Sequence, residues 1–150
     1  MAPVVTVHLV KLAVGIEDVE HLARVQKGRL EAAVRAGKAP GLRHLTRHRP
    51  KRAEDIAAGG SLYWVIGGAI AARQRVLGFE ESAKADGSPA HAILLDPELV
   101  RTAPRPFRPF QGWRYLPADK TPKDMGLVDV THAESLPAEL RKELRALGLI

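Results

Sequence analysis

The sequence contains no cysteine among its 150 residues. This absence excludes disulfide bonds, zinc–thiolate sites, iron–sulfur clusters and a cysteine nucleophile. No apolar run comes close to the roughly 18 residues that a membrane-spanning helix needs. The apolar start "MAPVVTVHLVKLAVG" lacks a basic leading region and a clear cleavage site, so we expect a strand there and not a signal peptide. We therefore expect a cytoplasmic protein with no membrane partner.

The usual catalytic motifs are also missing. "GGSLY" lacks the glycine that follows the serine of a nucleophile elbow, and "GGAIAA" lacks the lysine of a phosphate-binding loop. His44 and His48 are four residues apart, but the arginines and lysines around them oppose a metal cation. Glu80 and Glu81 are neighbours, which a strand would point to opposite faces. We expect no metal and no cofactor, and the sequence assigns no catalytic residue.

Positive charge is present, and it is unevenly distributed. The formal net charge is +6. The segment 41–52, "GLRHLTRHRPKR", holds five lysines and arginines and no acid, and the segment 101–115, "RTAPRPFRPFQGWRY", holds four arginines and no acid. The remaining residues therefore sum to −3. Two basic stretches on a slightly acidic body would attract a polyanion by electrostatic steering and counterion release.

Hydrophobic periodicity predicts an α+β protein with one domain over residues 1–150, long enough to bury a core. Residues 4–14 read as a strand whose buried face changes phase at Leu9–Val10, which predicts a bulge or a switch between two packing surfaces. A long helix is expected over 17–36, with Gln26 interrupting its apolar stripe. A short strand follows at 42–46, and a short helix runs from Pro50 to Ala58.

The second half predicts a β hairpin and then irregular chain. Residues 61–66 are rich in aromatic and β-branched side chains and predict a strand, after which Gly67-Gly68 makes a tight turn or a kink. Residues 69–77 are compatible with helix or strand, and we favour a strand that turns at Asp86-Gly87 into "AHAILLD". Prolines predict irregular surface chain over 101–124. A second amphipathic helix is expected over 136–147.

Aromatic residues are scarce, and four of the seven lie in "RPFRPFQGWRY", residues 105–115. Rings interleaved with arginines can stack on unpaired bases, at about 1–3 kcal/mol per base, while the arginines bind phosphate. The same rings could instead hold an irregular loop on the core, with the arginines extended into solvent. We expect Phe107 and Phe110 to be anchors and Trp113 and Arg114 to lie near a site. On the strand before it, we expect Trp64 in the core and Tyr63 on the surface.

The strings "GGSLYWVI" and "PFQGWRYL" resemble an uncharacterised bacterial family of domains of unknown function, and that likeness spans nearly the whole chain. The order of elements from Pro50 onward is also similar to PUA-like barrels, including ASCH and EVE modules. This second resemblance implies a small mixed or antiparallel β-barrel that binds RNA or a modified base in a cleft. The long helix directly after the first strand departs from that layout.

We expect a nucleic-acid-binding module, with RNA favoured, that uses a basic cleft with exposed rings. One alternative is a small enzyme acting on an anionic nucleotide-like metabolite, with His48 or Glu80 transferring a proton. Another is a protein-interaction subunit, because Trp, Tyr and Arg also dominate protein interfaces. The sequence does not predict the oligomeric state. The residues expected to bind nucleic acid are Arg47, His48, Lys51, Arg52, Tyr63, Arg73, Arg75, Gln111, Trp113 and Arg114.

Overall fold

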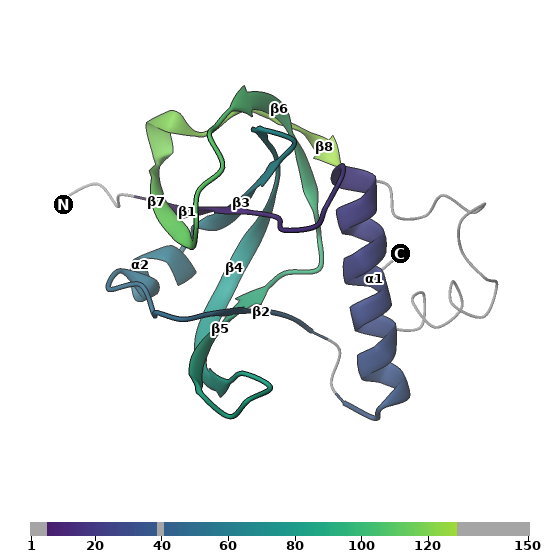
Figure 1. Cartoon of the computed structure of the whole chain (residues 1–150). Coiled ribbons are helices and arrows are strands. Elements are labelled where there is room, and N and C mark those ends of the chain that lie inside the picture. Colours follow the sequence, from purple (N-terminus) through teal and green to yellow (C-terminus); the bar gives the residue numbers. More distant parts are fainter. Residues whose placement is uncertain (1–5, 39–40, 129–150) are drawn as a thin grey trace.

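The computed structural model describes residues 6–38 and 41–128. Figure 1 shows a twisted sheet with the long helix α1 along one side and the short helix α2 near the other. The described elements, in chain order, are β1 (Val7–Leu12), α1 (Val19–Arg35), β2 (Leu42–Thr46), α2 (Ala53–Ala57), β3 (Ser61–Ile66), β4 (Ala69–Ala83), β5 (Pro89–Leu95), β6 (Val100–Pro106), β7 (Trp113–Pro117), the 3-10 helix η1 (Ala118–Lys120) and β8 (Asp124–Leu127).

The strands form one mixed sheet in the order β2-β5-β4-β3-β1-β7, with β6 paired to β4 and to β8. Only the β1–β3 pair among the described strands is parallel. The first half of β4 pairs with β3 and β6, and its second half pairs with β5. The mixed α+β class is therefore as expected. Within the described residues β2 and β7 do not pair with each other, so the sheet is open and the expected closure into a barrel is not seen.

The ambiguous segment after the double glycine is a strand, as favoured from the sequence. Gly67 and Gly68 both have positive φ angles, 61° and 81°, and form the tight turn between β3 and β4. Alanine and arginine favour helix, but in β4 every second side chain from Ile70 to Val76 is buried. Burial with a period of two stabilises an extended chain and overrides the weaker local preference.

Of the two causes expected for the phase change in β1, the structure shows the switch between two packing surfaces and not the bulge. The register of β1 is continuous against both β3 and β7. Val7 and Leu9 belong to one apolar cluster, and Val10 belongs to a second cluster with Tyr63 and Val65. The sheet is covered on both faces here, so apolar side chains point to both faces of this regular strand.

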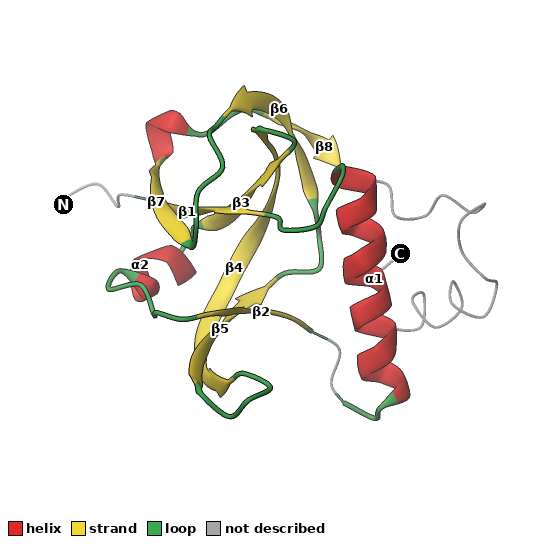
Figure 2. Cartoon of the chain, viewed as in Figure 1, coloured by secondary structure: helices red, strands yellow, loops and turns green. Residues whose placement is uncertain are grey.

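Residues 101–124 are irregular only over 107–112 and 121–123, which corrects the expectation of irregular chain throughout that their prolines suggested. Figure 2 shows β6, β7 and β8 as strands in and around this segment. Pro104 lies where the pairing of β6 with β4 shifts register, between Arg101 and Arg105. Pro117 is the last residue of β7. Prolines at a bulge or a strand end do not remove a needed ladder donor, so the strands persist.

Helix α1 packs on the first cluster through Val19, Leu22, Ala23 and Leu30. Asp18 caps the helix by accepting a hydrogen bond from the His21 backbone N–H at 2.7 Å. The Gln26 that interrupts the apolar stripe is buried and exchanges two amide hydrogen bonds with Gln74 of β4, at 2.7 and 2.8 Å. The interruption is therefore a built polar contact between helix and sheet.

None of the helices within the described ranges is both long and apolar enough to span a membrane. The helix expected over 136–147 lies outside the described residues.

Among the described glycines, Gly60 has the closest main-chain neighbours, and it lies at the junction of α2 and β3. A Cβ at this position would lie 2.0 Å from the Val7 carbonyl oxygen and 2.8 Å from that of Ile56. Both neighbours are main-chain atoms of structured segments, so they cannot move aside cheaply. The adjacent Gly59 has open space where its Cβ would be.

We predict that Gly60→Ala destabilises the protein by about 3 kcal/mol or more, since it forces β1 away from the end of α2. Gly59→Ala, the same change one residue earlier, should stay within about 1 kcal/mol of the wild type. Urea unfolding of the three proteins measures both values. Equal stability of the two variants would contradict the close approach at Gly60.

Candidate functional site

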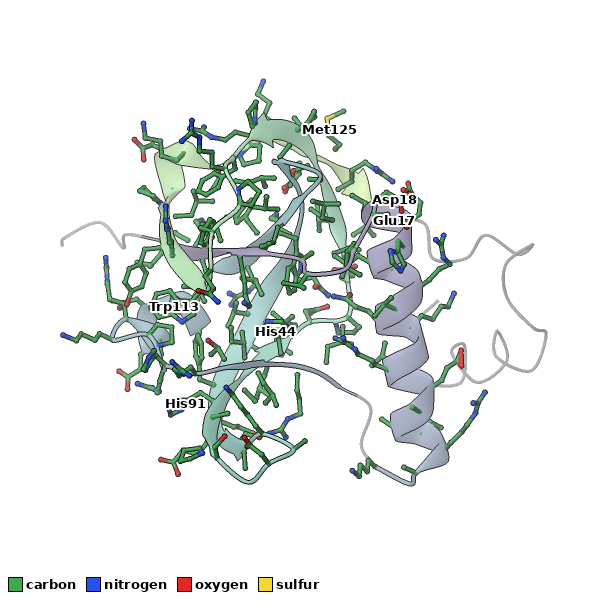
Figure 3. All side chains as sticks on the ribbon, in the orientation of Figure 1. Glu17, Asp18, His44, His91, Trp113 and Met125 are labelled. Atoms are coloured by element: carbon green, nitrogen blue, oxygen red, sulfur yellow. The ribbon has the colours of Figure 1, made fainter. Side chains whose placement is uncertain are left out.

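The two acid-free stretches of the sequence meet in the fold. The indole Nε1–H of Trp113 donates to the backbone carbonyl of His48 at 3.2 Å. The backbone N–H of Arg52 donates to the Tyr115 hydroxyl at 3.2 Å. Figure 3 shows Trp113 beside the connection between β2 and α2. Strand β7 therefore places the aromatic segment against the basic turn that follows β2.

A cavity of about 590 Å³ opens at this junction. Its walls come from β1, the end of β2, the turn after β4 and the segment leading into β7. No carboxylate side chain lies among its lining residues. The cavity is lined by Lys11, Leu45, Thr46, Arg47, His48, Lys84, Gln111, Gly112 and Trp113.

Strand register determines what lies at the floor of this cavity. Lys11 in β1 is directly opposite Trp113 of β7 and in register with Trp64 of β3. Side chains in register project from the same face of a sheet. A lysine is thereby held between two indole-bearing positions, on a strand that is hydrogen-bonded along both edges.

The Lys11 side chain is half-buried and forms no salt bridge with any carboxylate in the described part of the chain. Burial lowers the pKa of its ammonium group, because a charge loses hydration there. Arg47 and Lys84, the other two cations of the lining, are exposed and likewise form no salt bridge with a described acid. The site thus concentrates positive charge without internal compensation.

His44 is not part of the cavity lining and lies between the sheet and α1 (Figure 3). Its ring meets Trp64 edge-to-face at a centroid distance of 5.2 Å, and its Nε2 atom has no hydrogen-bond partner. Burial lowers the pKa of His44 to about 4, and the charges of Lys11 and Arg29 add to the effect. His44 is therefore neutral at physiological pH and belongs to the packing, not to proton transfer.

Four of the residues expected to bind nucleic acid line the cavity, and two more stand on the adjoining turn. The side chain of Arg52 on that turn also pairs with Asp55 at 3.1 Å. Lys51 beside it is exposed. The four in the lining are Arg47, His48, Gln111 and Trp113.

Tyr63 and Arg73 lie elsewhere, which corrects their expected placement at the same cleft. Tyr63 is only 4% exposed, because the second apolar cluster covers that face of β3. Arg73 makes two hydrogen bonds of 2.7 Å with the carboxylate of Asp124 and donates to Ser61 Oγ at 3.0 Å. This bidentate contact lowers the pKa of Asp124 and raises that of Arg73. The arginine is thus committed to holding β8 on the sheet.

Arg75 and Arg114 were also expected to line the cleft, and instead they make contacts that stabilise the fold. Arg75 donates to the carbonyls of Gly60 and Ala57, at 3.1 and 3.3 Å, and so satisfies backbone acceptors after α2. The guanidinium of Arg114 lies 4.4 Å from the centroid of the Phe110 ring. Arg114 does not line the cavity, because it alternates with Trp113 along β7 and projects from the other face.

The expected placement of Phe107, Phe110 and Trp64 is confirmed, whereas Tyr63, which was expected on the surface, is buried. Phe107 and Phe110 pack against the second apolar cluster, with their centroids 5.5 Å apart. Trp64 is 3% exposed and donates its indole N–H to Gln74 at 2.9 Å. Trp113 is only partly buried, and its ring meets that of Tyr115 at 5.1 Å.

Sequence reasoning missed Lys11 and Lys84. Lys11 carried a signal, because it is the only charged residue in the apolar run "VHLVKLAV". A charge inside such a strand indicates either a partner or a wet pocket. Lys84 carried none, because it stands next to a hairpin turn where lysine is common.

Comparison with known proteins gives a family for the chain. Residues 9–150 match the family described as "Protein of unknown function (DUF1489)". The chain belongs to the DUF1489 family. Searches of the curated proteins and of the solved structures found no match. The DUF1489 match supports the resemblance to a family of unknown function, and it adds no activity, ligand or site residue.

Within the described ranges, no three histidine, aspartate or glutamate side chains are grouped so as to hold a metal ion. His48 lines the cavity, whereas Glu80 is paired with Arg43 at 3.0 Å and is not part of the lining.

We predict that His44 makes the DUF1489 protein less stable in mild acid. The unfolded chain binds a proton at His44 near pH 6.5, and the folded chain does so only near pH 4. Stability is therefore full above pH 6.5 and falls as the pH drops through this window. His44→Phe keeps a ring beside Trp64 but cannot be protonated. Between pH 7 and pH 4.5, the free energy of unfolding should therefore fall by about 2 kcal/mol less in this variant than in the wild type.

Urea unfolding of wild type and His44→Phe at both pH values measures this difference. The burial-lowered pKa of His8 acts in the same direction, so the variant should keep part of the pH dependence. An identical loss of stability in the two proteins would contradict the assignment to His44.

Proposed function

We propose that this DUF1489 protein binds single-stranded RNA in the cavity between β1, β2 and β7. The observation that carries the proposal is the convergence of both acid-free stretches on one cavity with no carboxylate in its lining. Such a site repels cations and attracts polyanions. Salt screens the distant charges on the rest of the surface more strongly than the charges within the site, so this local preference persists.

The cavity also suits the bases of a nucleic acid. Its volume of about 590 Å³ falls in the range of sites for small organic ligands. Trp113 and the 41% exposed Leu45 supply apolar surface, while Thr46 and Gln111 supply polar groups. Stacking on an aromatic side chain requires a base that is unpaired, which favours a single strand over a duplex.

Phosphate contacts would come from Arg47 and Lys84 at the exposed rim, with Lys51 on the neighbouring turn. When lysine and arginine side chains without acidic partners contact phosphates, they displace the counterions that are condensed on the nucleic acid. We base the proposal on this arrangement and not on the resemblance to PUA-like barrels, because the described sheet is open.

The enzyme alternative has weaker support in the geometry. Its proposed proton-transfer residues were His48 and Glu80, and only His48 lines the cavity. Glu80 is held by Arg43 at 3.0 Å. No contact of the described residues favours the protein-interaction alternative over RNA. Co-purification of a protein that survives nuclease treatment and high salt would favour that alternative.

We predict that Arg47→Gln weakens binding of a single-stranded RNA and lowers the slope of log Kd against log salt by about 0.7 to 1, because one phosphate contact is lost. Fluorescence anisotropy between 50 mM and 300 mM salt measures the slope. The matched control is Arg24→Gln, the same loss of charge on the exposed face of α1. Equal slopes for the two variants, or wild-type binding that does not depend on salt, would refute the proposal.

We also predict that Trp113→Leu weakens binding by roughly 5- to 100-fold and leaves the salt slope unchanged, because it removes stacking and no charge. Thermal unfolding of the variant confirms that it is folded at the temperature of the measurement. A loss of affinity confined to low salt would instead indicate that the ring only positions the cations.

A further inference from the structure

Lys11 is the least exposed cation of the cavity and the one whose position is most strictly determined. Its strand is paired on both edges, with Trp113 on one side and Trp64 on the other. The side chain is half-buried, whereas Arg47 and Lys84 are exposed. None of the three has a salt bridge with a described carboxylate.

An ammonium group in this position is poorly satisfied by the protein alone. It has given up part of its hydration, and no salt bridge with a described carboxylate compensates for this loss. An anion that reaches the floor of the cavity would compensate the Lys11 ammonium group for its lost hydration, because a charge-assisted hydrogen bond is strongest where water is scarce.

The number of positive charges favours a dianion over a monoanion. Three cations border the cavity, from β1, from the residue after β2 and from the residue after β4. A phosphodiester inside an RNA strand carries one negative charge and has two chain arms that must both leave the cavity. A terminal phosphomonoester carries close to two charges near neutral pH and has only one arm.

We propose that the cavity holds a phosphomonoester at the end of a nucleotide, with Lys11 as its innermost ligand and Arg47 and Lys84 at the rim. The proposal deepens the RNA-binding function and rests on it for the source of the phosphate. The nucleoside attached to the phosphate then lies toward Trp113 and Leu45, the apolar part of the lining.

Isothermal titration calorimetry tests the proposal with one short single-stranded RNA in three forms: 5′-phosphorylated, 3′-phosphorylated and with both ends hydroxyl. One phosphorylated form should bind at least about 10-fold more tightly than the hydroxyl form. Lys11→Met should reduce this ratio to below about 2, and Lys11→Arg should retain it. Lys38→Met, at an exposed position after α1, is the matched control and should retain the full ratio.

Lys84→Met provides a second variant in case Lys11→Met does not fold, since Lys84 is exposed next to a turn. It should also lower the ratio. A nucleoside 5′-monophosphate titrated alone distinguishes the two sources: tight binding of the nucleotide together with weak binding of every RNA would keep the phosphomonoester site and overturn the RNA function.

Salt-dependent binding of all three RNA forms with equal affinity would overturn the phosphomonoester site and leave the RNA function intact. A ratio that stays high in both Lys11→Met and Lys84→Met would also overturn the assignment to this cavity.

Discussion

The antiparallel pairing of β1 with β7 is the constraint on which the candidate site depends. It sets Trp113 opposite Lys11 and carries the aromatic segment to the basic turn after β2. The parallel pairing of β1 with β3 then holds the same strand from its other edge. A strand fixed on both edges has little freedom to shift, so the floor of the cavity is formed before any ligand binds. Such preorganisation lowers the entropic cost of binding.

Charge in this protein is divided between two uses. Several arginines are paired with acids and hold segments together, as Arg73 does with Asp124 and Arg101 does with Glu20. The cations of the cavity have no such partners among the described acids. The net charge of +6 therefore understates the local field, because the acids neutralise arginines that lie outside the cavity. Electrostatic attraction depends on this local arrangement more than on the total.

Local patterns were sufficient for most of the elements. The strand over 42–46, the strand over 61–66 and the glycine turn after it occur as expected, because each depends on side chains close together in sequence. The prolines of 101–124 were misleading, since their effect depends on which backbone N–H groups face a neighbouring strand. That information lies in the pairing of β6 with β4 and is not contained in the segment itself.

By itself, the sequence determined which residue types were available: two acid-free basic stretches, four clustered rings and no cysteine. Tertiary structure decided which of them share a site. Tyr63 and Trp64 are adjacent, and from the sequence either could have been the exposed ring. The second apolar cluster buries Tyr63, and Trp64 donates a hydrogen bond to the Gln74 that also pairs with Gln26. Lys11 became part of the site only through its register with β7. The physical reason is that alternation along a strand determines which of its residues share a face, whereas only the long-range pairing of strands determines which other residues lie beside that face.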